Sequence, residues 1–471
     1  MSGTWKERER EMCHASRARL IAYDVVSEIR RRRAFAHNVL DARLAYEKGL
    51  PPEERAFAIT LVLGVTQTAG TLDEVITSVL NDSRDVQPDV WDALRISTYE
   101  ILFLDKDPYA AVDQGVELVR SFNPRAKNLA NAVLRRVSRV SKDFPFGDPD
   151  ADLSAFARSV GFPLWLAELL VSRLGKEKAQ EFMRASNEPA PVFMAVNLAK
   201  AGDREVFETL RDANAEPETY SFEDQVVPGC FLIKNSHALS DGRVKHLFQT
   251  GKVLVSDAAS QYIAAMAAQT AYGSRCREED DEVKFLEIGA GRATKTILLQ
   301  SQSKRIKGRY LSMTCIDNQD FKVNLLRKRL VEYGLPKARA KVADGTKLLD
   351  SFEACSYDAV FLDAPCTGIG TLRRHPEIRW RVDKDAILES AKLQSALLSN
   401  AAEMVKPGGV LVYATCTVTY EENVGVVKTF LETDLGSKFR VAPINGKAAF
   451  VSELSHGKSD AHFAVRMVRL S

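Results

Sequence analysis

The spacing of apolar residues changes along the chain and predicts regions of different architecture. Up to about residue 145, apolar side chains recur three and four positions apart, as in Val112, Val116 and Val119, and this period is typical of amphipathic helices. We therefore predict an all-helical domain over residues 1–145. The stretch 143–152, DFPFGDPDAD, is rich in Pro, Gly and Asp and is the best candidate for a linker.

The middle of the chain alternates between helical stretches and short strand-like runs. The runs are residues 193–198, 231–234 and 253–256. This mixture predicts a small α+β module over residues 160–257. The order of its strands does not follow from the pattern.

From residue 258 onward, short apolar runs without alternation are separated by helical stretches. The runs are residues 283–288, 310–316, 357–362 and 409–415. Such runs predict strands covered on both faces, and hence a doubly wound, mostly parallel sheet in a Rossmann-like domain over residues 258–471. Ligands of these sheets bind beyond the carboxyl ends of the strands. We expect one common crevice there, bordered by Glu287, Asp317, Asp363, Thr415 and Cys416.

Composition narrows the class of protein only a little. The 471 residues include 65 basic and 63 acidic side chains, so the net charge of +2 gives no overall nucleic-acid signature. No apolar run approaches the roughly 20 residues of a membrane span, and the N-terminus lacks the apolar core of a signal peptide. We expect a cytoplasmic protein that does not bind a membrane. Seven cysteines without a Cys-x-x-Cys pair indicate neither a disulfide framework nor a metal site.

One local cluster of cations stands out against this neutral background. Residues 118–142 contain seven cations and no acid, namely Arg120, Arg125, Lys127, Arg135, Arg136, Arg139 and Lys142. A run of this kind is often only a solvated helix face. The absence of any acid also favours a phosphate-binding surface.

The first strand of the predicted sheet is followed by EIGAGRATKT, residues 287–296. Its small residues allow the backbone to approach a ligand closely, and Asp317 at the next strand end could bind ribose hydroxyls. This pattern indicates a nucleotide-like cofactor. A plain tight turn, a dinucleotide site or a methyl-donor site would each look similar.

Two cysteines distinguish between these alternatives. Cys366 and Cys416 each lie just beyond a strand, and a parallel sheet would bring the two strand ends within side-chain reach. Either cysteine alone could be a buried core residue. Together, with Asp363 three residues before Cys366, they favour a catalytic site. Lys295 nearby could lower the pKa of a thiol and so activate it as a nucleophile.

The segments DAPCTGIGTLRRHPEIRW (363–380) and YATCTVTYEEN (413–423) resemble the two signature motifs of the Sun-type RNA (cytosine-C5)-methyltransferases, and most closely the RsmB (Fmu) branch. RAFAITLVLGVTQTAGTLDEVI and NLANAVLRRV resemble the NusB-like domain of that branch. VLVSDAASQYIA resembles the segment that leads into its methyltransferase domain. The resemblance implies a NusB-like RNA-binding domain and a Rossmann-like methyltransferase domain that uses S-adenosyl-L-methionine.

The resemblance also implies roles for individual residues. Cys416 would be the nucleophile that adds to cytosine C6, and Cys366 would assist release of the product. Asp363 would hold the N3/N4 edge of the base, with Lys295 as a fourth catalytic residue. The cofactor would be bound by Gly289, Ala290, Gly291, Arg292, Ala293, Thr294, Lys295, Asp317, Lys322, Asp344 and Asp363. In this chain Arg292-Ala293-Thr294 replaces the Pro-Gly-Gly that the family has in the cofactor loop.

The expected substrate is ribosomal RNA. By the resemblance, the protein would form 5-methylcytosine in 16S (small-subunit) ribosomal RNA. We expect it to be a monomer. We expect RNA contacts from Arg373, Arg374, Arg379, Arg135 and Arg136. The alternative for the first three is an exposed charged loop with a packed Trp. The rival hypothesis is a catalytically silent RNA-binding or assembly factor with a degenerate methyltransferase fold, which the altered cofactor loop would suit.

Overall fold

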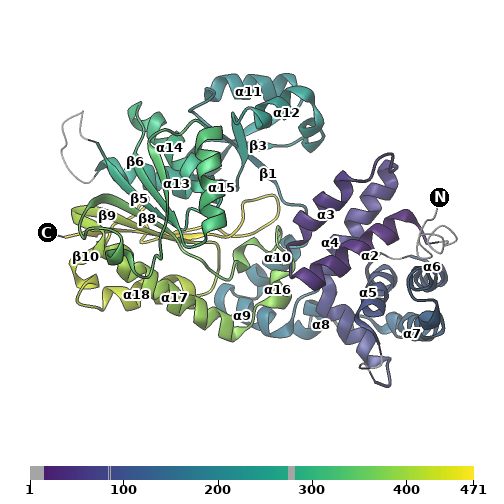
Figure 1. The fold of residues 1–471 in the computed structure, drawn as a ribbon. Coiled ribbons are helices and arrows are strands. Elements are labelled where there is room, and N and C mark those ends of the chain that lie inside the picture. The colour runs from purple at the N-terminus through teal and green to yellow at the C-terminus, as the bar shows by residue number, and fades with distance from the viewer. Residues whose placement is uncertain (1–14, 83, 85, 105, 274–281, 471) are drawn as a thin grey trace. The chain divides into compact units, whose positions relative to one another are not determined.

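The computed structural model divides into two compact units (Figure 1). The first contains residues 1–188 and 372–382, and the second contains residues 189–371 and 383–471. The expected limit of the helical domain at residue 145 therefore lies inside the first unit. The structure describes residues 15–82, 84, 86–104, 106–273 and 282–470.

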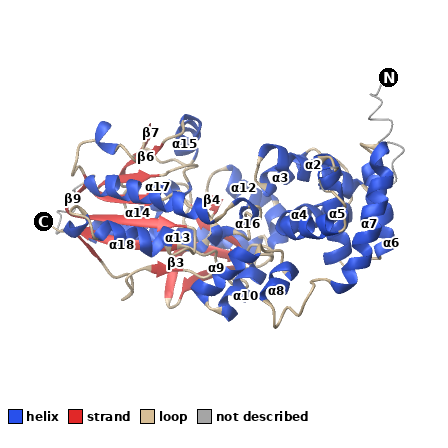
Figure 2. Ribbon diagram, turned by 90° about the horizontal axis from the view of Figure 1, so that it is seen from below, coloured by secondary structure: helices blue, strands red, loops and turns tan. Residues whose placement is uncertain are grey.

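The first unit is helical throughout its described part, as Figure 2 shows. Its main core joins buried apolar residues from Ala15 to Val137. Consecutive helices pack as neighbours because short turns connect them. The helices are α2 (Arg17–Arg32), α3 (Ala36–Ala45), α4 (Pro52–Ser78), α5 (Pro88–Phe103), α6 (Pro108–Arg120), α7 (Lys127–Val140), α8 (Leu153–Ser159), α9 (Leu164–Leu174), α10 (Lys176–Ala185) and the distant α16 (Ile378–Arg381).

Helix α16 belongs to the first unit although it follows Cys366 in the sequence. The Trp380 indole N–H lies 3.1 Å from the carbonyl oxygens of Thr66 and Gln67 on α4. Gly70 makes room for the indole, because a Cβ at that position would lie 2.2 Å from Trp380 Cζ3. Segment 372–382 is thus built into the helical unit by specific contacts.

Helix α4 is long and apolar enough to cross a membrane, and the bent pair α8 and α9 passes the same test as a broken span. The most apolar window of α4 is 50% buried inside the structure, as expected of a core helix.

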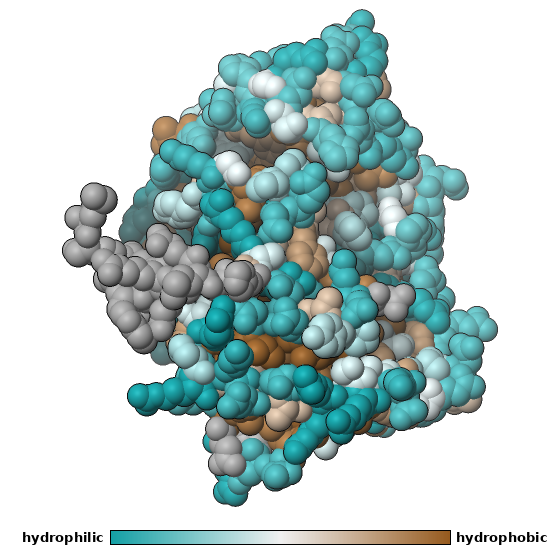
Figure 3. All heavy atoms as spheres, turned by 90° about the vertical axis from the view of Figure 1, so that its right-hand side faces the viewer, coloured by the Kyte–Doolittle hydropathy of each residue, from teal (hydrophilic) through white to brown (hydrophobic). Residues whose placement is uncertain are grey.

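The face in Figure 3 is mainly hydrophilic, and hydrophobic residues show there in small areas between polar ones.

The second unit contains two sheets. Its helices are α11 (Asp203–Asp212), α12 (Gly242–Gln249), α13 (Ala258–Gly273), α14 (Thr294–Lys307), α15 (Asp320–Glu332), α17 (Lys384–Glu403) and α18 (Val426–Leu431). Its strands are β1 (Val192–Val196), β2 (Pro217–Phe222), β3 (Gln225–Ile233), β4 (Val253–Val255), β5 (Lys284–Ile288), β6 (Ser312–Asp317), β7 (Ala338–Val342), β8 (Tyr357–Asp363), β9 (Val405–Thr415), β10 (Phe439–Val441), β11 (Phe450–Val451) and β12 (Phe463–Arg469).

The small sheet has the order β2-β3-β1-β4, with antiparallel pairing. The large sheet has the order β10-β12-β9-β8-β5-β6-β7, and β11 pairs with β12. Strands β9, β8, β5, β6 and β7 run parallel to one another, whereas β12 is antiparallel to β9. The expected Rossmann-like architecture is therefore confirmed.

The large sheet lies between two layers of helices (Figure 1). Apolar residues of α13, α14 and α15 form one core with the sheet, and those of α17 and α18 form another core with it. Six of the seven residues of β8 are buried because the strand is covered on both faces. This burial explains why apolar and polar residues do not alternate along β8. The strand ends with Asp363, which therefore lies at the carboxyl edge of the sheet.

Candidate active site

The parallel strands bring the predicted catalytic residues together at one edge. Leu362 on β8 pairs with Ile288 on β5 and with Tyr413 on β9, so the segments that follow these strands begin side by side. A cavity of about 450 Å³ opens there. Asp317, Asp363, Cys366 and Cys416 line it, whereas Glu287 does not.

The two cysteines face each other. Cys366 Sγ lies 3.4 Å from Cys416 Sγ, and the Cys416 backbone N–H also points at Cys366 Sγ, 3.4 Å from N to S. The hydrogen bond to Cys416 and burial both raise the pKa of the Cys366 thiol well above its usual range. Cys366 therefore keeps its proton at neutral pH.

Asp363 is paired with the buried cation Lys295. Lys295 Nζ donates to Asp363 Oδ2 at 3.0 Å, and the lysine is only 9% exposed. Burial is the largest single influence and would lower the pKa of Lys295, but the charge of Asp363 and its hydrogen bond, with smaller contributions from Cys416 and Glu287, together raise the pKa. The ammonium group thus stays charged at neutral pH and fixes one oxygen of Asp363 beside the sulfurs.

The loop between β5 and α14 is shaped by its first glycine. Gly289 has a φ of +84°, and a Cβ there would lie 2.5 Å from the carbonyl oxygen of Asp363. Gly289 and Gly291 border the cavity. By contrast, the side chains of Ala290 and Ala293 are buried in the core formed with α13–α15.

The altered part of this loop therefore does not block the cavity. Arg292 is exposed, and Arg292, Ala293 and Thr294 do not border it. Neither does Lys295, which approaches the site through Asp363. The residues that this chain has in place of Pro-Gly-Gly therefore do not line the space where the family resemblance would put the cofactor.

Three polar residues predicted for the cofactor lie along the same cavity. Asp317 ends β6, and its carboxylate accepts a hydrogen bond of 3.0 Å from the Gln319 N–H. Lys322 Nζ is 3.9 Å from Asp317 Oδ1, too far for a hydrogen bond. The N–H and hydroxyl of Thr346 hold the pKa of Asp344 below its usual range.

Among the predicted RNA contacts, Arg379 is wrong. Its side chain is fully buried in the first unit, and its guanidinium donates to Asn187 Oδ1 at 2.9 Å and to the Gly161 carbonyl at 3.1 Å. It also lies over the Phe162 ring, 4.1 Å from the centroid. Burial lowers the pKa of Arg379 to about 9. It anchors segment 372–382 rather than RNA.

The other arginines differ in exposure. Arg373 is buried at 3% exposure and Arg374 is half-buried. Arg135 and Arg136 on α7 are exposed. Arg135 donates only to the neighbouring Asn131, and Arg136 to the carbonyl of Val79. The RNA contacts of these four residues stay predictions.

Sequence reasoning missed Glu422, which lies in the π-helical turn Glu421–Gly425 directly after the second cysteine motif. It is fully buried and accepts hydrogen bonds from Thr367 and Thr417, the residues that follow the two cysteines. The run of threonines before a glutamate in TCTVTYEEN was the available signal, because buried hydroxyls need an acceptor.

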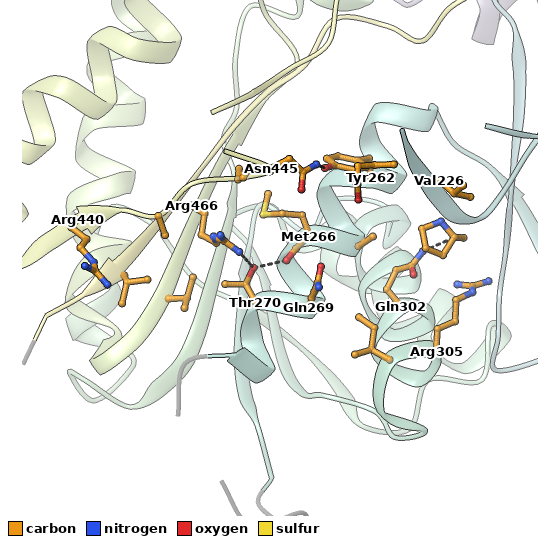
Figure 4. A pocket seen from close by; sticks show the side chains of 18 residues that line it. Val226, Tyr262, Met266, Gln269, Thr270, Gln302, Arg305, Arg440, Asn445 and Arg466 are labelled. Carbon is orange, nitrogen blue, oxygen red and sulfur yellow. Dashed lines mark hydrogen bonds between the residues drawn. The ribbon is translucent and has the colours of Figure 1, made fainter. Parts of the chain in front are cut away.

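A second cavity, of about 880 Å³, lies between α13, α14 and the β10–β12 edge of the sheet (Figure 4). Its polar side chains are largely occupied by the protein itself. Arg466 Nη1 donates to Thr270 Oγ1 at 3.3 Å, Asn445 Nδ2 donates to Tyr262 Oη at 2.6 Å, and Arg305 is ion-paired with Asp203. No residue predicted for the site borders this cavity.

The chain matches two family models. The model described as 16S rRNA methyltransferase RsmB/F matches residues 276–462, and the NusB family model matches residues 16–139. A Mycobacterium tuberculosis protein whose name describes a methyltransferase is 30% identical over 419 residues, which are 87% of this chain and 85% of that protein. The chain belongs to the RsmB/F methyltransferase family.

Other relatives agree with this assignment. The Vibrio cholerae protein named ribosomal RNA small subunit methyltransferase B is 26% identical over 403 residues, 84% of this chain and 85% of that protein. The solved structure of a protein named PH0851 shares the fold, with a TM-score of 0.77 and 21% identity over 97% of this chain and 99% of that one.

As a member of the RsmB/F family, this methyltransferase takes its methyl group from S-adenosyl-L-methionine. The expected NusB-like domain and methyltransferase domain are confirmed. Across the described parts of both units, no group of three or more His, Cys, Asp or Glu side chains is placed to hold a metal ion.

Proposed function

We propose that the protein forms 5-methylcytosine in small-subunit ribosomal RNA, with Cys416 as the nucleophile. The observation that carries this proposal is the pair of sulfurs 3.4 Å apart on the cavity wall, with Asp363 beside them. A single pyrimidine ring in the cavity could be reached by both sulfurs and by the carboxylate. The names of relatives such as the Vibrio cholerae protein support the RNA substrate.

The cavity fits S-adenosyl-L-methionine. Gly289 leaves the backbone open where a Cβ would meet Asp363, and the Asp317 carboxylate at the end of β6 is placed to accept hydrogen bonds from two ribose hydroxyls. Asp344 and Lys322 border the same space. When bound, the cofactor supplies an electrophilic methyl group.

The chain's own residues would prepare the cytosine for that methyl group. The Cys416 thiolate forms a bond to C6. The electron pair of the C5–C6 double bond moves onto C5 and is shared with C4 and N3, so that C5 becomes nucleophilic. Asp363, held by Lys295 at 3.0 Å, would orient the N3/N4 edge by accepting a hydrogen bond from the N4 amino group, and the Lys295 ammonium behind it would stabilise the negative charge that develops on the ring.

The second cysteine would act when the product leaves. A water molecule or hydroxide ion, acting as the base, takes the proton from the methylated C5, the electron pair of that C–H bond re-forms the C5–C6 double bond, and the Cys416 thiolate is expelled. The Cys366 S–H group lies 3.4 Å from that sulfur and can donate a hydrogen bond to it as the C–S bond breaks. Cys366 therefore assists release without forming a bond to the base.

Substitution of each cysteine tests the proposal. With 16S ribosomal RNA and labelled S-adenosyl-L-methionine, Cys416→Ala should lose both methylation and the covalent RNA adduct seen on denaturing gels. Cys366→Ala should instead accumulate the adduct. Exchanged phenotypes would make Cys366 the nucleophile, as in the DNA-type arrangement. RNA binding without any methyl transfer by the wild type would favour the silent assembly factor.

A further inference from the structure

Glu422 is a buried carboxylate surrounded by five hydrogen-bond donors. Its Oε2 atom accepts from the hydroxyls of Thr367 at 2.6 Å, Thr419 at 2.7 Å and Thr417 at 3.1 Å. Its Oε1 atom accepts from the Thr367 N–H at 2.8 Å and from Gln394 Nε2 at 3.1 Å. All five donors are neutral. An ionised carboxylate only accepts hydrogen bonds, so this set of donors suits the charged form.

These contacts join the two cysteine loops. Thr367 follows Cys366 and Thr417 follows Cys416, and their hydroxyls lie 3.0 Å apart under the same carboxylate. Gln394 on α17 also donates to the Pro365 carbonyl at 2.9 Å, which ties the first loop to the helix. The relative position of the sulfurs therefore depends on one side chain that does not border the cavity.

The charges around the two sulfurs are unequal. The ionisable groups that act on Cys366 are Cys416 and Glu422, together with Tyr413 on β9. The negative charge of Glu422 adds to the rise in the pKa of Cys366, after the hydrogen bond to Cys416 and burial. The cation Lys295, which is paired with Asp363, has an electrostatic interaction with Cys416. The two sulfurs therefore differ in the charges that act on them.

We propose that Glu422 is a positioning residue that fixes the two cysteine loops to each other and makes the sulfurs inequivalent, so that Cys366 keeps its proton while Cys416 attacks. This inference rests on the proposed function for the identity of the attacking sulfur. Glu422 does not contact the base. It acts through Thr367, Thr417 and the electric field at Cys366.

Alkylation of the RNA-free, full-length protein with iodoacetamide tests the inequivalence directly. Rates at Cys366 and Cys416 are followed by peptide mass spectrometry between pH 6 and pH 10. In the wild type, Cys416 should react at least about tenfold faster near neutral pH, which corresponds to about one pH unit between the two profiles. In Glu422→Gln the ratio should shrink several-fold, because Cys366 becomes easier to ionise.

Glu422→Gln is nearly isosteric. Its amide oxygen can still accept from Thr367 N–H and Gln394, and its amide nitrogen can donate to the threonine hydroxyls, which can reverse direction. Glu432→Gln is the matched control because it removes an exposed carboxylate of the same unit. It should leave the ratio and the methylation rate unchanged.

A second variant distinguishes the effect of the negative charge of Glu422 from the effect of its hydrogen bonds to the two cysteine loops. Glu422→Asp keeps the charge but is one methylene shorter, so it cannot reach both loops as well. It should preserve the order of alkylation while kcat for methylation falls about tenfold and the KM for S-adenosyl-L-methionine stays within about twofold. Glu422→Asp also provides a test of the inference if Glu422→Gln folds poorly.

Two results would overturn the inference. The first is a folded Glu422→Gln variant whose alkylation ratio equals that of the wild type. The second is an equal loss of both the alkylation ratio and kcat in Glu422→Gln and Glu422→Asp, which would indicate that Glu422 is a purely structural residue. Failure of the proposed function looks different. In that case wild-type protein would not methylate RNA, while the alkylation ratio would still respond to Glu422→Gln.

Discussion

Gly289 and Asp363 approach so closely that no side chain fits between them. A Cβ at Gly289 would lie 2.5 Å from the Asp363 carbonyl oxygen, and its φ of +84° already disfavours any other residue. The loop between β5 and α14 and the residue proposed to hold the base are therefore in direct contact. A change in one must displace the other.

We expect Gly289→Ala to weaken S-adenosyl-L-methionine binding at least about tenfold, or about 1.4 kcal/mol, by isothermal titration calorimetry. The control is Gly308→Ala at the end of α14, which has a similar φ of +68° but nothing within 4 Å of the added Cβ. Backbone strain should cost both variants about 1–2 kcal/mol of stability, and Gly289→Ala should lose more because its Cβ also meets the Asp363 carbonyl oxygen. Equal cofactor affinity in the two variants would contradict the role assigned to the contact.

Glu287 makes stability depend on pH. Burial raises the pKa of Glu287 to about 7 from 4.5, although the Thr296 hydroxyl donates to its Oε2 at 2.6 Å. Because the folded-state pKa lies above the unfolded value, the stabilisation by protonated Glu287 is complete below pH 4.5 and is lost as the pH rises through 7.

Glu287→Gln should therefore gain stability over the wild type as the pH rises. The difference in unfolding free energy should grow by an amount on the order of 3 kcal/mol between about pH 4.5 and 7 and then level off. Urea unfolding at a series of pH values measures it. A difference that stays constant or shrinks over this range would show that Glu287 is ionised in the folded protein.

Arg379→Met should destabilise the first unit by about 3 kcal/mol, because the carbonyl and amide oxygens that bind the guanidinium lose their donor inside the protein. The control is Arg184→Met, which removes an exposed guanidinium 4.9 Å from the Phe156 ring and should cost less than about 1 kcal/mol. Chemical unfolding compares them. If Arg379→Met instead kept its stability and bound RNA more weakly, the prediction that Arg379 contacts RNA would be supported after all.

The double variant Arg135→Ala and Arg136→Ala should weaken RNA binding at a cost of no more than about 1 kcal/mol of stability, since both side chains are exposed on α7 and only the hydrogen bond from Arg136 to the Val79 carbonyl joins another helix. If each neutralises one phosphate, the slope of log affinity against log salt should fall by roughly 1.5. Fluorescence anisotropy at several salt concentrations gives the slope. Arg204→Ala, an exposed arginine of the second unit, is the control, and an equal effect there would point to overall charge alone.

The sequence predicted the features that depend on local pattern. Strands β5, β6, β8 and β9 were identified because burial on both faces leaves an uninterrupted apolar run. The meeting of Cys366 and Cys416 followed from the parallel order of these strands. The edge strand β7 was not identified, since its residues are mostly exposed and two of its five are Arg339 and Lys341.

Long-range packing could not be predicted in the same way. In the sequence, Arg379 looks like any other member of a basic loop, and its burial depends on Gly161 and Asn187, which lie 218 and 192 residues away. Similarly, the role of Glu422 depends on Thr367, 55 residues earlier. Charged residues are assigned to the surface by default, and only the fold shows which are enclosed.

Because residues 372–382 belong to the helical unit, the polypeptide passes between the units three times. A fragment that starts at Pro189 would keep every residue of the candidate active site, but it would leave the Arg379 guanidinium and the Trp380 indole, 13 and 14 residues after Cys366, without their binding partners. Separate expression of the catalytic half should therefore yield an aggregation-prone protein, and the two halves are better regarded as one inseparable folding unit.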